Sequence, residues 1–231
     1  MKHSPKVIDK VFWSAYTRYA ETQDMTGAEK QRVEQVLSRL FEFGASAPQS
    51  VLDAGCNSGA YTLALAMSGF KATGVDFAPG LLSSARRRAA ELKVPATFEK
   101  MDLDKVFWYA DNDFDHAICT SVLHAVKRPE WVLDELHRVL KPGGLLIITL
   151  WLDPVKHREA FPEEFTEPAP SSNNPGGLIA RARQAAKSLS EGKRRAHYWT
   201  PAEIQQLLTR HQFEILQSQG APLHTVVARR A

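Results

Sequence analysis

The stretch Val51-Leu52-Asp53-Ala54-Gly55-Cys56-Asn57-Ser58-Gly59 carries the strongest indication of the fold. Its apolar beginning, residues 51–54, is typical of a short strand buried in a sheet. Gly55 and Gly59 allow a sharp turn and a close approach of the backbone to a ligand, although an ordinary tight turn explains the glycines alone equally well. A helix that begins after this turn presents free N–H groups. Because open α/β sheets bind ligands at the carboxyl ends of their strands, the stretch predicts a binding site here.

Short apolar runs and helical patterns alternate along the chain from residue 50 onward. This order predicts a parallel sheet with crossover helices, because parallel strands need such connections. Two further apolar runs, 213–216 and 224–228, predict an antiparallel end to the sheet. The predicted fold is therefore α/β, a doubly wound and mostly parallel sheet of seven strands. The other predicted strands are 51–54, 72–75, 96–101, 114–120 and 145–151, and the helices between them are 61–67, 81–92 and 131–140, the last ended by Pro142-Gly143-Gly144.

The flanks of this alternating region have a different character, and we expect one domain over residues 1–231. A helical cap is predicted for 1–45, a cofactor-binding core for 50–151, and an insertion after the fifth strand for 152–199. Residues 200–231 are expected to add a helix and two strands. Thr200, Pro201 and Glu203 predict the start of that helix, as N-cap, first helical residue and partner of the capping box.

The composition is that of an ordinary globular protein, with 44% hydrophobic and 24% charged residues among 231. No apolar run approaches the length of about 18 residues that a membrane-spanning helix needs, so we expect no membrane partner. Residues 1–10 lack the apolar core of a secretory signal, which favours a cytoplasmic location. Two distant cysteines, Cys56 and Cys119, predict neither a disulfide framework nor a metal site. The net charge of +3 does not by itself indicate nucleic acid.

Carboxylates stand at the ends of three successive predicted strands. Asp76 follows Asp53 by 23 residues, close to the spacing at which an acidic residue binds the hydroxyls of a ribose. Asp102 ends the third strand, where it can accept a hydrogen bond from an adenine amino group. Burying three such groups without partners is costly, and a polar nucleoside ligand explains all three together.

These stretches together resemble a class I S-adenosylmethionine-dependent methyltransferase, which implies a Rossmann-like fold. The resemblance covers residues 50–151, with a weaker match over 198–228. Its separate motifs are Val51 to Gly59, Gly74-Val75-Asp76-Phe77, Met101-Asp102, residues 114–126 and residues 136–151, including Leu140-Lys141-Pro142-Gly143-Gly144. One position departs from the family pattern, because Asn57 stands where the family usually has glycine.

The resemblance implies S-adenosyl-L-methionine as cofactor and a role for each matching residue. Asp53 would reach the methionine amino group, and Asp76 would hold the ribose hydroxyls. The other implied cofactor contacts are the backbone of Gly55, Cys56 and Gly59, the ring of Phe77 against adenine, Met101, Asp102 and Leu103 around the adenine edge, the backbone of Thr120 near the methionine amine, and Tyr16 and Tyr19 from an aromatic helix over the cofactor. For these two tyrosines, packing in the core is an equally good explanation.

A small, aromatic or amphipathic metabolite is the methyl acceptor that we expect. His124 follows the fourth strand and is the candidate general base, which an acceptor needs when it must lose a proton; a capping or surface histidine explains it at least as well. A tRNA or protein acceptor stays open, as does a regulatory module that binds cofactor without turnover. The basic segment 181–195 could attract an anionic acceptor, a phosphate or a tRNA, although a solvated helix is the favoured explanation of it. A dehydrogenase is disfavoured because the second glycine of G-x-G-x-x-G is missing. The oligomeric state is not predicted.

Overall fold

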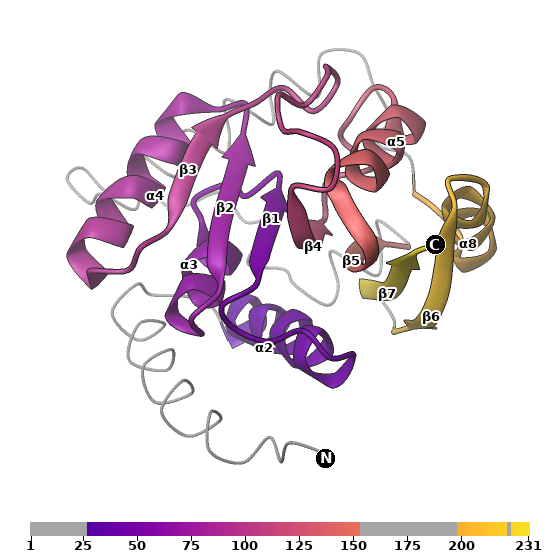
Figure 1. Cartoon of the computed structure of the whole chain (residues 1–231), viewed down its shortest axis with the longest axis horizontal. Helices are drawn as coiled ribbons and strands as arrows, with labels where there is room; N and C mark the ends of the chain where they lie inside the picture. Colours follow the sequence, from indigo (N-terminus) through magenta and orange to yellow (C-terminus); the bar gives the residue numbers. More distant parts are fainter. Residues whose placement is uncertain (1–26, 153–197, 221–222) are drawn as a thin grey trace.

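A seven-stranded sheet forms the centre of the molecule in the computed structural model, which describes residues 27–152, 198–220 and 223–231 (Figure 1). The strand order is β3-β2-β1-β4-β5-β7-β6. The pairs β3–β2, β2–β1, β1–β4 and β4–β5 are parallel, and β7 runs antiparallel to both β5 and β6. The predicted mostly parallel sheet with an antiparallel end is confirmed. The strands are β1 (Ser50–Ala54), β2 (Lys71–Asp76), β3 (Thr97–Lys100), β4 (Phe114–Thr120), β5 (Leu140–Trp151), β6 (Phe213–Gln219) and β7 (Leu223–Arg230).

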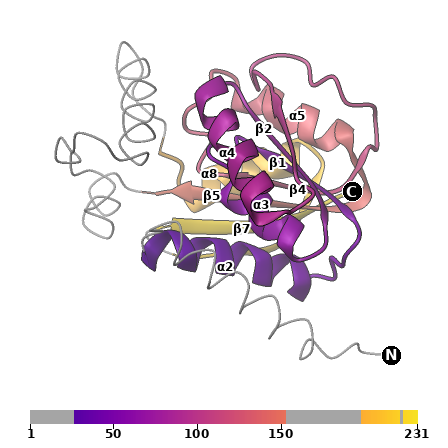
Figure 2. The same cartoon turned by 90° about the vertical axis from the view of Figure 1, so that its left-hand side faces the viewer.

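Helices cover both faces of this sheet, as the doubly wound prediction requires (Figures 1 and 2). One face packs against α2 (Gly27–Glu42), α3 (Ala60–Met67) and α4 (Pro79–Leu92), with Val51, Ile147 and Val227 among the strand residues buried there. The other face packs against α5 (Pro129–Val139) and α8 (Pro201–Arg210), with Leu52, Ile148 and Val226 among its buried strand residues. Successive residues of a strand point to opposite faces, so strands apolar at every position become buried on both sides.

Helix α2 belongs to the core rather than lying over it as a separate cap. Its apolar stripe, Val33, Val36, Leu37 and Leu40, is at most 1% exposed. These residues recur at helical spacing, which places them on one face of α2. They lie in the same apolar cluster as α3 and the sheet. The aromatic segment with Tyr16 and Tyr19, and most of the predicted insertion 152–199, lie outside the described residues.

Two predicted helix ends have different outcomes. Thr200 caps α8 as expected: its side chain accepts from the Glu203 backbone, and Glu203 accepts from the Thr200 backbone. Helix α5 ends at Val139, and Pro142-Gly143-Gly144 lies inside β5 rather than in a separate turn. The pairing of β4 with β5 shifts register between Phe114 and His116, and this irregularity accommodates the Pro-Gly-Gly segment at the start of β5.

An ion-paired clamp on α5 holds the loop that connects β3 to β4. The Arg138 guanidinium donates to the carbonyl of Tyr109 at 2.8 Å and to that of Phe107 at 2.9 Å. It also pairs with Glu135, with 2.8 Å between Nη2 and Oε2. Glu135 in turn accepts the Phe107 N–H at 2.6 Å. Arg138 also pairs with the Asp111 side chain of this loop at 2.8 Å, so the loop that follows the carboxyl end of β3 is fixed to α5 by both backbone and side-chain contacts.

None of the helices within the described ranges is both long and apolar enough to cross a membrane.

Candidate functional site

The turn from β1 into α3 adopts the backbone that its glycines permit. Gly55 and Gly59 both have φ of +85°, and Asn57 has φ of +52°. Asparagine tolerates the left-handed region better than most residues, so the departure at this position leaves the turn intact. A Cβ on Gly55 would lie 2.3 Å from Val122 Cγ2, and one on Gly59 would lie 2.8 Å from the Phe98 ring. Both glycines are required for the close packing of this turn.

Asp76, at the end of β2, binds the same turn. Its Oδ2 accepts the Asn57 N–H at 2.9 Å, and its Oδ1 accepts the Ala78 N–H at 2.9 Å. The side chain is buried, yet each carboxylate oxygen keeps a second lone pair. Asp76 therefore organises the turn and retains the capacity to accept hydrogen bonds from a pair of ligand hydroxyls.

Asp53, on the neighbouring strand β1, is completely buried. Its Oδ2 accepts a hydrogen bond from the Thr62 hydroxyl at 2.6 Å, whereas its Oδ1 has no hydrogen-bond partner among the described residues. Burial raises the pKa of Asp53 to about 7; the Thr62 hydrogen bond opposes the shift and the charge of Asp76 adds to it. A buried carboxylate with one open oxygen is suited to a cationic partner such as an ammonium group.

The segment after β3 closes the other side of the crevice. The Met101 N–H donates to the Asp76 carbonyl at 2.9 Å, which places this segment beside the end of β2. Met101 and Leu103 are buried, whereas the Asp102 side chain is half-exposed and accepts the Asp104 N–H at 3.1 Å. Phe77 is 61% exposed, an unusual state for a phenyl ring. The exposed Phe77 ring and the half-exposed Asp102 carboxylate thus follow the ends of two neighbouring strands, a position that suits contact with a purine base.

Three residues that sequence reasoning missed lie around Asp53 and Thr120. Besides Thr62, the Tyr61 side chain lies near Thr120 and interacts electrostatically with Arg32 and Asp53. Burial raises the pKa of Tyr61 well above its usual range, so its hydroxyl stays protonated. The Arg32 guanidinium, on α2, lies over the Trp151 ring at 6.0 Å from the centroid. Thr62 could have been found from the sequence, because it is a polar residue within an otherwise apolar helix. Nothing in the sequence distinguishes Arg32 from the other charged residues of the amphipathic α2.

His124 lies in the turn that follows β4 and is partly buried. This turn also carries Val122, the residue that faces Gly55, so it borders the glycine turn. The two cysteines have no role in this chemistry. Both are buried, and burial raises the pKa of each thiol, which disfavours the nucleophilic thiolate.

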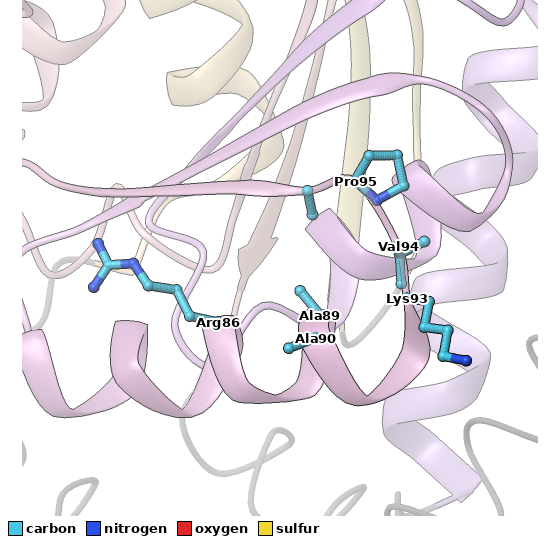
Figure 3. Close-up of a pocket in the computed structure, with 7 residues that line it drawn as sticks. Arg86, Ala89, Ala90, Lys93, Val94 and Pro95 are labelled. Carbon is cyan, nitrogen blue, oxygen red and sulfur yellow. The ribbon is translucent and has the colours of Figure 1, made fainter.

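A surface hollow lies elsewhere, between the end of α4 and the chain leading into β3 (Figure 3). Arg86, Lys93, Val94 and Pro95 are among its lining residues. Because these residues precede β3, the hollow is at the amino end of that strand, whereas the aspartates lie at the carboxyl ends. It is not part of the crevice.

Comparison with known proteins agrees with this geometry. Residues 52–148 match the family model described as "Methyltransferase domain". The matched range covers less than half of the chain. It contains the glycine turn, Asp53, Asp76 and the segment after β3.

Relatives and solved structures extend the comparison beyond the domain itself. Ubiquinone biosynthesis O-methyltransferases of Pseudomonas paraeruginosa and Xanthomonas oryzae pv. oryzae are each 30% identical, over 110 and 118 residues. These alignments cover 48% and 51% of this chain and 47% and 48% of the relatives, so the chain spans about half the length of the relatives it matches. Magnesium protoporphyrin IX methyltransferase from Synechocystis PCC 6803, solved with bound SAH, has a TM-score of 0.64 at 18% identity, covering 97% of this chain and 96% of that one. A SAM-dependent methyltransferase from Aquifex aeolicus has a TM-score of 0.62 at 19% identity, covering 94% and 98%. These two likenesses establish the shared Rossmann-like fold.

The residues of the crevice fit S-adenosylmethionine on two structural observations. The open Oδ1 of Asp53 is a buried acceptor for the methionine ammonium, and each carboxylate oxygen of Asp76 keeps a lone pair for a ribose hydroxyl. Asp76, Phe77 and Asp102 would hold the nucleoside. Individual roles for Cys56, Met101, Leu103, Thr120 and His124 stay predictions.

The charge of Asp53 is expected to make ligand binding pH-dependent. Because the folded-state pKa of Asp53 is raised to about 7 from 3.8, the folded protein holds a proton that the unfolded chain loses between about pH 4 and 7. The free energy of unfolding therefore falls as pH rises through this window.

An ammonium ligand prefers ionised Asp53, so the Kd of S-adenosylhomocysteine should fall about tenfold between pH 6 and 8. Calorimetric titration at both values measures this change, and Asp53→Asn should remove it. Equal affinities of wild type at pH 6 and 8 would refute the assignment.

Proposed function

We propose that this chain is an S-adenosylmethionine-dependent methyltransferase that acts on a small molecule. The observation that carries the proposal is the buried Asp53 with its open oxygen, next to Asp76 and the glycine turn. The methyltransferase family match over residues 52–148 supports it. The named relatives act in ubiquinone biosynthesis as O-methyltransferases, which favours an oxygen acceptor on a small molecule.

When bound, S-adenosylmethionine supplies a methyl group activated by the positive charge on sulfur, and the protein mainly supplies position. Asp53 orients the amino acid end, and Asp76 fixes both the ribose and the turn that encloses it. Leu103 and the apolar residues after β3 keep water from the base. His124, in the turn after β4, is the candidate to accept a proton from an acceptor hydroxyl.

Titration with S-adenosylmethionine and S-adenosylhomocysteine tests the proposal. Wild type should bind both in the micromolar range, and Asp76→Ala should weaken binding at least tenfold. Part of that loss is direct, and part arises because the Asn57 and Ala78 N–H groups lose a charged acceptor. Asp113→Ala removes an exposed carboxylate from the loop before β4 and is the matched control, with affinity unchanged.

Each alternative corresponds to a distinct result. Binding of both ligands without methyl transfer to any of a panel of phenols, acids and amines would favour a regulatory module. Salt-sensitive binding of tRNA would favour a nucleic-acid acceptor. Failure to bind either ligand would leave the fold and refute the proposed activity. A cytoplasmic location stays a prediction from the sequence.

A further inference from the structure

Asp104 joins the segment after β3 to the chain that enters α5. Its Oδ1 accepts the N–H of Lys127 at 2.8 Å and the N–H of Arg128 at 3.0 Å. The Arg128 guanidinium also donates to the Asp104 carbonyl, and the indole N–H of Trp131 donates to the Lys105 carbonyl at 3.1 Å. Residues 104 and 105 therefore hold the start of α5 through both backbone and side-chain groups.

The cap of α5 is thus supplied by a distant part of the chain. Arg128, the residue before the helix, makes no side-chain cap hydrogen bond, and Pro129 has no N–H to offer. The Asp104 carboxylate provides the acceptor instead, and a charged acceptor forms stronger hydrogen bonds than a neutral one. The bonded residues are 23 and 24 positions apart in the sequence. These bonds therefore fix two segments relative to each other rather than shaping one local turn.

The segment that holds α5 also carries Asp102, one of the residues that would hold the nucleoside. Asp102 Oδ1 accepts the Asp104 N–H at 3.1 Å, and the Asp102 carbonyl accepts the Lys105 N–H at 3.0 Å. Residues 102–105 therefore form one hydrogen-bonded turn, in which a movement of Asp102 also moves Asp104. The Met101 N–H, bonded to the Asp76 carbonyl, connects this turn to the end of β2.

The chain that Asp104 holds includes His124, the candidate base. The turn over residues 121–128 follows β4 directly and leads into α5. At its beginning, the Ser121 N–H donates to the Thr149 carbonyl on β5 at 2.9 Å. At its end lie the two N–H groups that Asp104 accepts. The turn is therefore fixed at both ends, and one of these attachments comes from the nucleoside side of the crevice.

We propose that Asp104 is a positioning residue that couples the nucleoside end of the cofactor site to the turn that carries His124. A ligand that contacts Asp102 immobilises residues 102–105, and the hydrogen bonds of Asp104 pass this constraint to residues 121–128. Coupling between sites is reciprocal, so an acceptor that fixes the turn strengthens binding of the nucleoside by the same factor. Cofactor and acceptor should therefore bind with positive cooperativity. This inference rests on the proposed methyltransferase function and adds a means of regulation to that same site.

Hydrogen exchange of the full chain, measured by mass spectrometry with and without saturating adenosine, tests the coupling. Adenosine has the nucleoside but lacks the sulfur and the amino acid end of the cofactor. A response in residues 122–125 therefore reports a constraint that the protein transmits. In wild type, adenosine should slow exchange by about fivefold or more in residues 101–105 and in residues 122–125.

The variants change the acceptor oxygen step by step. Asp104→Ala should keep the response of residues 101–105 and reduce that of residues 122–125 to less than about twofold. Asp104→Asn keeps an oxygen acceptor without the charge, so its response should lie between those of wild type and Asp104→Ala. Asp113→Ala removes an exposed carboxylate from the same β3–β4 loop and is the matched control, with the response of wild type.

A purely structural role of Asp104 gives a different pattern. Loss of a helix cap speeds exchange in the first turn of α5 with or without adenosine, and it leaves the adenosine response of residues 122–125 intact. That pattern would overturn the proposal. So would a wild type whose residues 122–125 do not respond to adenosine, or any other order of the three responses. The proposed function stands in each of these cases, because it is refuted by a separate result, the failure of wild type to bind S-adenosylhomocysteine.

Discussion

Arg138→Ala is expected to lower the free energy of unfolding by about 3 kcal/mol. The variant removes the guanidinium that holds the Phe107 and Tyr109 carbonyls, and it leaves the Glu135 carboxylate buried without its ion partner. Leaving one buried charge without its partner costs more free energy than the intact ion pair contributes. Removal of Arg138 alone therefore destabilises the protein by more than the net contribution of the Arg138–Glu135 pair. For a chain of this size the Tm should fall by about 6–12 °C.

Urea unfolding monitored by circular dichroism measures this loss. Arg87→Ala is the matched control, since Arg87 is an exposed arginine on α4 whose ion pair with Glu91 spans 3.9 Å, and its removal should change stability by less than about 0.5 kcal/mol. A second variant, Glu135→Gln, keeps the shape and an acceptor for the Phe107 N–H while removing the charge. It should fall between wild type and Arg138→Ala. Equal stability of Arg138→Ala and Arg87→Ala would show that α5 does not hold the β3–β4 loop.

Gly55→Ala is the second large effect, with an expected loss of about 3 kcal/mol in the free energy of unfolding. Part arises from the backbone, because φ of +85° costs an L-residue about 1–2 kcal/mol. The remainder arises from the new Cβ, which would lie 2.3 Å from Val122 Cγ2 and forces a shift in the turn after β4. The same displacement should weaken S-adenosylhomocysteine binding more than tenfold, because Gly55 and Cys56 donate to the Val75 carbonyl and so align the turn with β2.

A double-mutant cycle separates the two contributions. Val122→Ala alone creates space, and Gly55→Ala in that background should recover the steric part but not the part due to φ. The expected coupling energy is about 1–2 kcal/mol. Gly80→Ala, at a position where a Cβ meets no atom within 4 Å, is the control and should be neutral or slightly stabilising. Additive effects of the Gly55 and Val122 changes would show that the turn does not pack as described.

Most of the sheet was predictable because its signals are local. The apolar runs that form β1, β2, β4 and β5 are short, bounded by turn residues and separated by helical patterns. The glycine turn indicated where the first strand ends and the first crossover helix begins. Asp53 and Asp76 were found because each ends a strand, and parallel strands bring such ends together. The start of α8 was found because Thr200 and Glu203 act within one turn of the helix.

What could not be predicted depends on contacts between distant segments. The hydrogen bond from Thr62 to Asp53 and the position of Arg32 over Trp151 result from how α3 and α2 lie on the sheet, which no local pattern specifies. The start of β5 at Leu140 depends on pairing with Phe114, and it overrides the usual effect of Pro142 and Gly143 as breakers.

The place of β7 has a consequence for how the chain is made. This strand follows β6 in the chain but lies between β5 and β6, so the outer edge of β5 stays unpaired until residues 223–230 have left the ribosome. From Leu145 to Trp151 every residue of β5 except Thr149 is apolar, and a strand of this kind recruits other chains when its edge is left open. A nascent chain stalled before residue 223 therefore exposes an aggregation-prone edge of β5. Synthesis of β7 allows this edge to pair and so removes the risk.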